Sequence, residues 1–132
     1  MQLKEGERIS IIGARQLAKE QSFFAGHGLP VLSAILAKRL YNPNLKICFE
    51  SGAIYSNPER LPHSVSDIIN YSSAQFQLDL PDAFAMLEKG KVDVVGLSGA
   101  QVDSRGNINS TLINAEGTIK RLPGSGGACD FA

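Results

Sequence analysis

A strand, a glycine turn, a helix and a second strand follow one another early in the chain, and this order constrains the fold more than any other feature. Ser22–Ala25 has the composition of a short strand. Gly26-His27-Gly28 follows, and Leu29–Tyr41 has a helical pattern with Pro30 in the first turn, where a missing N–H does no harm. Leu45–Phe49 is the next apolar strand. This is the signature of a βαβ unit, so the sequence predicts an α/β fold with an open, largely parallel sheet.

Apolar spacing and capping residues predict two more helices. Between Glu7 and Glu20, apolar residues recur at helical spacing, which predicts an amphipathic helix that buries these positions: Ile9, Ile12, Ala14, Leu17 and Ala18. Pro81–Gly90 opens on proline, has an acid in its first turn and ends in glycine, so it reads as a capped helix. On that helix, Phe84 and Met86 are expected to be core residues.

The remaining segments predict strands, turns and one long loop. Val92–Ser98 is a predicted strand, and residues 100–111 reverse through Ser104-Arg105-Gly106-Asn107 in a hairpin-like turn. Ile119–Leu122 is a possible further strand. Residues 51–80 are expected to form a long loop with one short helix near Val65–Asn70.

Composition excludes several classes of protein. With 132 residues, 43% hydrophobic and 20% charged, the sequence predicts a single globular domain over residues 1–132. Lysine plus arginine equals aspartate plus glutamate at 13 each, and no basic cluster appears, so we expect no nucleic-acid partner. No apolar run approaches the roughly 18 residues of a membrane span, and the first residues lack a signal layout. We therefore expect a soluble, cytoplasmic protein with no membrane partner.

The cysteines and histidines predict no metal site. Cys48 and Cys129 have no short metal-type spacing, and reduced packing residues are favoured over a disulfide. His27 and His63 have no cysteine or carboxylate at ligand spacing.

Glu50 is the candidate nucleophile. It closes the strand Leu45–Phe49, and Ser51-Gly52 follows at once, so a carboxylate stands where a strand ends and the chain must turn. In an open α/β sheet, ligands bind outside the carboxyl ends of the strands. The alternative is a solvated turn residue, which is the commoner role of an acid at such a position.

Two glycine segments are candidate ligand loops. Gly26-His27-Gly28 lacks the third glycine of a dinucleotide fingerprint, and a tight strand-to-helix turn explains it as well. Gly124-Ser125-Gly126-Gly127-Ala128 is denser, and its amides can form a nest that serves as an oxyanion hole. No lysine followed by serine or threonine closes this loop, so it is not a phosphate-binding loop of the Walker type.

Taken together, six blocks in order resemble the β subunit of family I coenzyme A transferases, closest to the glutaconate and 3-oxoacid groups. The blocks are Gly26–Pro30, Glu50–Gly52, Leu61–Asp67, Gly99–Asp103, Gly106–Ser110 and Gly124–Ala128. The resemblance implies an open sheet with helices on both faces, in a fold similar to that of sugar-phosphate isomerases.

The resemblance also implies site residues and partners. Glu50 would be the catalytic nucleophile, and the Gly126 and Gly127 amides the oxyanion donors. Asn109 would orient substrate or Glu50, while Ser51 and Gly28 would line the substrate site. The substrates would be an acyl-CoA and a carboxylic acid, with no metal and no bound cofactor. An α-type subunit would complete a hetero-oligomer.

The chain departs from the family in length, and this leaves alternatives open. Family β subunits continue well past the last glycine block, so the domain is expected to be truncated at its C-terminus. One alternative is an acyl-CoA hydrolase of the same fold, and another is a non-catalytic partner subunit. His27 stands where the family tends to place a small or aliphatic residue. Asp67 is expected to cap a helix or to shape the Glu50 loop, and Asp103 to be a turn acid.

Overall fold

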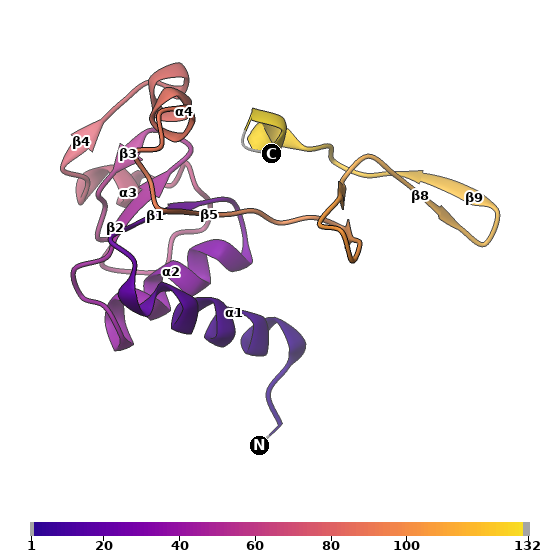
Figure 1. Cartoon of the computed structure of the whole chain (residues 1–132), viewed down its shortest axis with the longest axis horizontal. Coiled ribbons are helices and arrows are strands. Elements are labelled where there is room, and N and C mark those ends of the chain that lie inside the picture. The colour runs from indigo at the N-terminus through magenta and orange to yellow at the C-terminus, as the bar shows by residue number, and fades with distance from the viewer. Residues whose placement is uncertain (1, 131–132) are drawn as a thin grey trace. The chain divides into compact units, whose positions relative to one another are not determined.

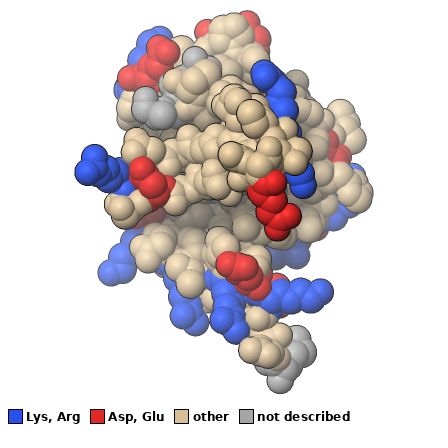
Figure 2. Space-filling view, turned by 90° about the vertical axis from the view of Figure 1, so that its right-hand side faces the viewer, with Lys and Arg blue, Asp and Glu red and all other residues tan. Residues whose placement is uncertain are grey.

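The computed structural model describes residues 2–130, which form two compact units. One unit ends at Leu97 and the other begins at Ser98, and each is described by itself. On the face shown in Figure 2, acidic and basic side chains lie interspersed among uncharged residues. None of the helices described in the chain has the length and apolar character needed to cross a membrane.

A parallel three-stranded sheet is the centre of the first unit. Its order is β2 (Lys46–Phe49), β1 (Ser22–Ala25) and β5 (Val94–Gly96), with both neighbours parallel to β1. Phe24 lies opposite Cys48 on one side and Val95 on the other. The predicted βαβ unit and its parallel sheet are confirmed, because α2 (Leu29–Leu40) connects β1 to β2.

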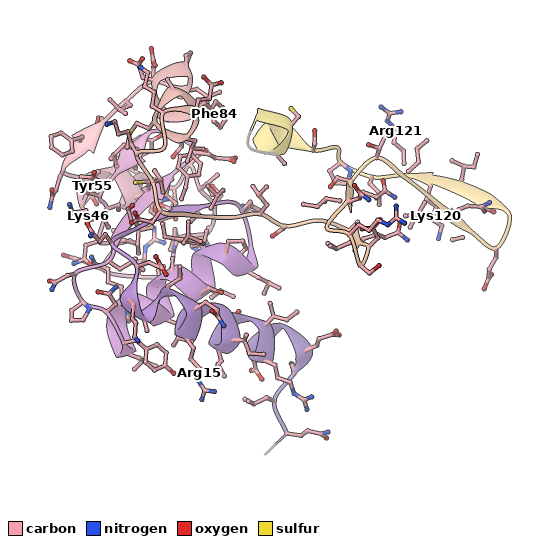
Figure 3. All side chains as sticks on the ribbon, in the orientation of Figure 1. Arg15, Lys46, Tyr55, Phe84, Lys120 and Arg121 are labelled. Carbon is pink, nitrogen blue, oxygen red and sulfur yellow. The ribbon has the colours of Figure 1, made fainter. Side chains whose placement is uncertain are left out.

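Helices cover both faces of this sheet, as predicted (Figure 1). Phe23, Ile47 and Phe49 belong to the buried cluster that also contains residues of α2 and of α1 (Glu5–Gln16). Phe24 alternates to the other face, where its ring centroid lies 6.4 Å from that of Phe84. Phe84 belongs to α4 (Leu80–Glu88), so α4 packs against the opposite face (Figure 3). The expectation that Phe84 is a core residue fits this contact.

The inward face of α1 differs from the prediction. Ile9 and Ile12 are 48% and 58% exposed, whereas Ser10 and Ala14 are buried. The reason is a close approach to α2 through small residues, since a Cβ on Gly13 would come within 2.6 Å of the Ser33 hydroxyl oxygen. The predicted helix also ends earlier, and the burial of Leu17 falls in a 3₁₀ turn, Leu17–Lys19.

A small ribbon lies within the segment predicted to be a long loop. β3 (Ala53–Ile54) and β4 (Phe76–Gln77) pair antiparallel, and α3 (Ile68–Ser72) stands between them in the chain. The short helix was expected near residues 65–70, and the ribbon was not predicted. Beside the ribbon, the Lys46 ammonium lies 4.9 Å from the ring centroid of Tyr55 (Figure 3).

The second unit consists of two hairpins and a terminal 3₁₀ turn. β6 (Gln101–Val102) pairs antiparallel with β7 (Ile108–Asn109), which confirms the predicted reversal. β8 (Leu112–Ala115) pairs antiparallel with β9 (Thr118–Arg121), so the predicted strand over residues 119–122 has a partner that was not predicted. The 3₁₀ turn η2 spans Gly126–Asp130.

Candidate active site

Glu50 occupies a tight turn at the carboxyl end of β2. The strand behind it is fully buried at Ile47, Cys48 and Phe49. The Gly52 amide donates to the Phe49 carbonyl at 2.9 Å, so Glu50 and Ser51 are the two central residues of a β-turn. Glu50 is half-buried. The predicted position of this carboxylate, at the end of a strand where the chain turns, is what the structure has.

Gly52 fixes the direction in which the chain leaves this turn. Its φ is +95°, a conformation that favours glycine, and a Cβ there would collide with the Leu78 carbonyl oxygen. The Leu78 amide donates to the Gly52 carbonyl at 2.9 Å. The turn is therefore locked against the segment that follows β4, and no other residue type fits at Gly52 without movement.

Ser51 is held on both its side chain and its main chain. The Ser51 hydroxyl donates to the Val65 carbonyl at 2.6 Å, and the Tyr71 hydroxyl donates to the Ser51 carbonyl at 2.7 Å. Asn70 is fully buried, and its side-chain amide donates to the same Val65 carbonyl at 2.9 Å. The Ser51 hydroxyl, predicted to contact substrate, is thus engaged with the protein in this structure.

Asp67 anchors the segment that carries Val65 and Tyr71. It caps α3 by accepting from the Ile69 amide at 3.1 Å. It also accepts from the His63 amide at 3.0 Å and pairs with both terminal nitrogens of Arg60 at 3.0 and 3.1 Å. The His63 amide, then Arg60, then the Ile69 amide hold the pKa of this carboxyl well below its usual range. The predicted capping role is confirmed, and the capped segment shapes the Glu50 turn.

The Gly26-His27-Gly28 loop lies at the same edge of the sheet. Ala25 pairs with Phe49, so this loop and the Glu50 turn leave adjacent parallel strands. Gly28 has a φ of +88° at the start of α2, and the Gly26 amide donates to the Gly96 carbonyl at 2.9 Å. These geometries favour the tight-turn interpretation. A cavity of about 320 Å³ opens here, lined by residues that include His27, Gly28, Pro62, His63 and Ser64.

Asn109 belongs to the second unit and uses its side chain to join the hairpins. Its amide nitrogen donates at 2.7 Å to the Gln101 side-chain oxygen and to the Leu112 carbonyl, and its oxygen accepts from the Thr111 amide at 3.0 Å. Both N–H groups are thus engaged within this unit. The substrate-orienting role predicted for Asn109 stays a prediction.

Asp103 is a turn acid, as predicted. It accepts from the Asn107 side chain at 2.7 Å and from the Asn107 and Arg105 amides at 2.8 Å each. These hydrogen bonds, that of the Asn107 side chain foremost, lower the pKa of Asp103 below its usual value.

The terminal glycine segment borders a cavity of its own in the second unit. The Gly124 amide donates to the Ser110 carbonyl at 2.9 Å, which ties the segment to the end of β7. Gly126 opens η2 with a φ of +55°. The cavity measures about 360 Å³ and is lined by residues that include Ser110, Ser125 and Cys129. The first amides of a helix have no partner within it, which suits the donor role predicted for Gly126 and Gly127.

Two groups of predicted site residues result, one in each unit. Glu50, Ser51 and Gly28 share the carboxyl edge of the sheet in the first unit, while Asn109, Gly126 and Gly127 belong to the second. Within residues 2–130, no three histidine, cysteine or acidic side chains are placed to hold a metal ion. Both cysteines are free thiols, Cys48 buried and Cys129 exposed. Sequence reasoning missed Tyr71, whose partner is a main-chain carbonyl and so leaves no pattern in the sequence.

Comparison with known proteins gives one consistent set of relatives. A family model described as coenzyme A transferase matches residues 7–132. The β-type subunit of 3-oxoadipate CoA-transferase from Pseudomonas knackmussii is 38% identical over 128 residues, covering 96% of this chain and 49% of the relative. The β-type subunit of glutaconate CoA-transferase from Acidaminococcus fermentans is 34% identical over 140 residues, covering 98% and 50%.

A solved structure agrees with these relatives. The crystal structure of glutaconate coenzyme A-transferase from Acidaminococcus fermentans superposes with a TM-score of 0.82 at 29% identity, covering 97% of this chain and 52% of that one. The chain thus spans about half the length of the curated relatives it matches.

Proposed function

The chain belongs to the coenzyme A transferase family, and from this membership we propose that it is a β-type subunit that moves coenzyme A between an acyl-CoA and a carboxylic acid. The observation that carries the proposal is the β-turn that presents Glu50 at the carboxyl edge of the parallel sheet. A buried strand behind this turn and the hydrogen bonds around it supply the rigidity that a nucleophile needs.

The proposed reaction begins when a Glu50 carboxylate oxygen attacks the thioester carbonyl carbon. The C–S bond breaks, which leaves an acyl-glutamyl anhydride and a CoA thiolate. The thiolate then attacks the Glu50 carbonyl carbon, the C–O bond to the acyl group breaks, and the first acid leaves as a carboxylate. The result is a glutamyl-CoA thioester, and an incoming acid reverses the two steps to leave with the CoA.

This chemistry sets electrostatic demands on the site. Glu50 has to be ionised to attack, and its half-buried position keeps the carboxylate in reach of solvent and substrate. Each tetrahedral step places negative charge on an oxygen, and one well-placed donor contributes about 3 to 4 kcal/mol to such a step. We assign this role to the Gly126 and Gly127 amides. The proposed steps need no metal and no bound cofactor.

Partners and substrates are further parts of the proposal. Because both named relatives are β-type subunits, we propose an α-type subunit as partner in a hetero-oligomer. The acids in the names of these relatives, 3-oxoadipate and glutaconate, are the first substrates to test. The cytoplasmic location stays a prediction from the sequence.

Chemical trapping of Glu50 tests the proposal. The complete enzyme, assembled with its α-type partner, is incubated with acyl-CoA, treated with borohydride or hydroxylamine, and mapped by peptide mass spectrometry. We expect modification at Glu50 and loss of CoA exchange in Glu50→Gln. Glu59→Gln is the matched control, because Glu59 is an exposed acid on the loop that follows β3. Exchange that survives Glu50→Gln would overturn the proposal, and release of free CoA without an acceptor acid would favour hydrolysis.

A further inference from the structure

The Glu50 side chain depends on its own main chain for its position. Within residues 2–130, no side chain or amide is hydrogen-bonded to the Glu50 carboxylate, and no cation pairs with it. The carboxylate is therefore available to react. Its orientation is set by the dihedral angles of the turn that carries it, so whatever fixes the turn also fixes the nucleophile.

The weak point of this turn is the peptide unit between Ser51 and Gly52. Glycine tolerates positive and negative φ almost equally, so this peptide is free to rotate unless its carbonyl or amide is held. The Gly52 amide is held by the Phe49 carbonyl at 2.9 Å. The Ser51 carbonyl, on the same peptide plane, is held by the Tyr71 hydroxyl at 2.7 Å. Together these two hydrogen bonds fix both polar groups of one peptide.

Tyr71 is itself placed by packing and by a buried polar side chain. Its half-buried ring packs against the main hydrophobic cluster. Its neighbour Asn70 is fully buried and donates to the Ser64 and Val65 carbonyls at 3.1 and 2.9 Å. Val65 in turn accepts from the Ser51 hydroxyl at 2.6 Å. The segment over residues 64–71 thus grips Ser51 at two atoms.

We infer that Tyr71 is a positioning residue for Glu50, acting through its hydrogen bond to the Ser51 carbonyl. This inference rests on the proposed function of Glu50. The reacting oxygen and the thioester carbon have to meet at about 3 to 3.5 Å, and a displacement of about 1 Å can cost about a hundredfold in rate. Loss of the Tyr71 hydroxyl frees the Ser51–Gly52 peptide and spreads Glu50 over several orientations.

Tyr71→Phe tests the inference, since it removes one oxygen and keeps the packed ring. In the assembled enzyme we expect kcat to fall by about ten- to a hundredfold, with KM for acyl-CoA little changed. Trapping of the Glu50 thioester in a single turnover should slow by the same factor. Tyr41→Phe is the matched control, because Tyr41 is 40% exposed and lies at the far end of α2.

A second variant covers the case in which Tyr71→Phe does not fold. Ser51→Ala removes the hydroxyl that bonds to Val65 and adds no bulk, so it loosens the same turn from the other side. We expect roughly a tenfold lower kcat. If the Ser51 hydroxyl instead contacts substrate, KM rises and kcat does not fall.

The outcomes separate this inference from the proposed function. If the wild-type enzyme shows no exchange through Glu50, the proposed function fails and this inference falls with it. If the wild-type enzyme is active but both variants keep its kcat and trapping rate, only the positioning role is overturned. A lower kcat that is matched by an equal loss of folded, assembled enzyme also overturns it in favour of a purely structural role.

Discussion

The two units differ in how they are held together. All the fully or largely buried apolar side chains of the described chain lie between Ala14 and Ala83, in the first unit. Over residues 98–129, no residue reaches that degree of burial. The second unit is instead stabilised by hairpin ladders and by turn residues such as Asp103 and Asn109, which satisfy neighbouring amides with their side chains.

This difference bears on the proposed division of labour. The candidate nucleophile stands on a turn backed by a hydrophobic core, whereas the candidate oxyanion donors stand on a segment without one. A two-stranded hairpin in water is marginally stable by itself. We therefore expect the first unit to dominate the free energy of unfolding, and the second to be ordered more weakly.

The largest effect on unfolding should come from emptying the core of the first unit. Phe24 is fully buried between the strands and Phe84, so Phe24→Ala should lower the free energy of unfolding by about 3 to 5 kcal/mol. Ile119→Ala is the matched change in the second unit, where Ile119 is 72% exposed. It should stay within about 0.5 kcal/mol. Urea unfolding of both variants measures this, and equal losses would contradict the comparison.

The next effect should come from two glycines with similar dihedral angles and different surroundings. Gly52 has a φ of +95° and no room for a Cβ beside the Leu78 carbonyl, whereas Gly117 has a φ of +80° and open space around it. Gly52→Ala should cost about 3 kcal/mol, from strain and collision together. Gly117→Ala carries only the strain of a positive φ, about 1 kcal/mol.

Thermal unfolding and CoA exchange, measured on both glycine variants, check this prediction. Gly52→Ala should also lower exchange, because the turn that carries Glu50 has to move away from Leu78. If Gly117→Ala destabilises the chain as much as Gly52→Ala, the second unit is more cooperative with the first than its burial indicates.

Much of the first unit could be predicted from sequence because its elements are marked locally. The buried strands are short apolar runs, and α4 carries its own caps, with the Asp79 carboxylate accepting from the Asp82 amide at 2.9 Å. The position of Glu50 follows from such marks. The face of α1 does not, because Ile9 and Ile12 have the right spacing while the close contact of Gly13 with Ser33 decides which side is buried.

The rest of the site depends on contacts that have no sequence pattern. β3 and β4 have two residues each, too few to show a period of two. The bond from Tyr71 ends on a main-chain carbonyl, which every residue possesses. The resemblance to a family supplied Gly126, Gly127 and Asn109 as site residues, and their roles are still predictions.

The smallest effect should be confined to acidic solution, where two depressed carboxyl groups titrate. The pKa of Asp67 is lowered chiefly by the His63 amide and by Arg60, and that of Asp103 chiefly by Asn107. A carboxyl whose pKa is lower in the folded than in the unfolded chain stabilises the fold above its usual pKa, and this stabilisation is lost as the pH falls through the folded value. Stability should therefore decline below about pH 4, the usual range of an aspartate.

Asparagine substitutions at these two positions compare the two units directly. Asp67→Asn should lower the melting temperature at neutral pH and flatten its decline in acid, because Asp67 anchors the segment that packs on the core of the first unit. Asp103→Asn should change the global melting temperature less, since its turn can open without exposing a buried core. Melting curves from pH 7 to pH 2 measure both variants. If Asp103→Asn removes more of the acid dependence than Asp67→Asn does, the hairpin unit, rather than the sheet, limits the stability of the chain.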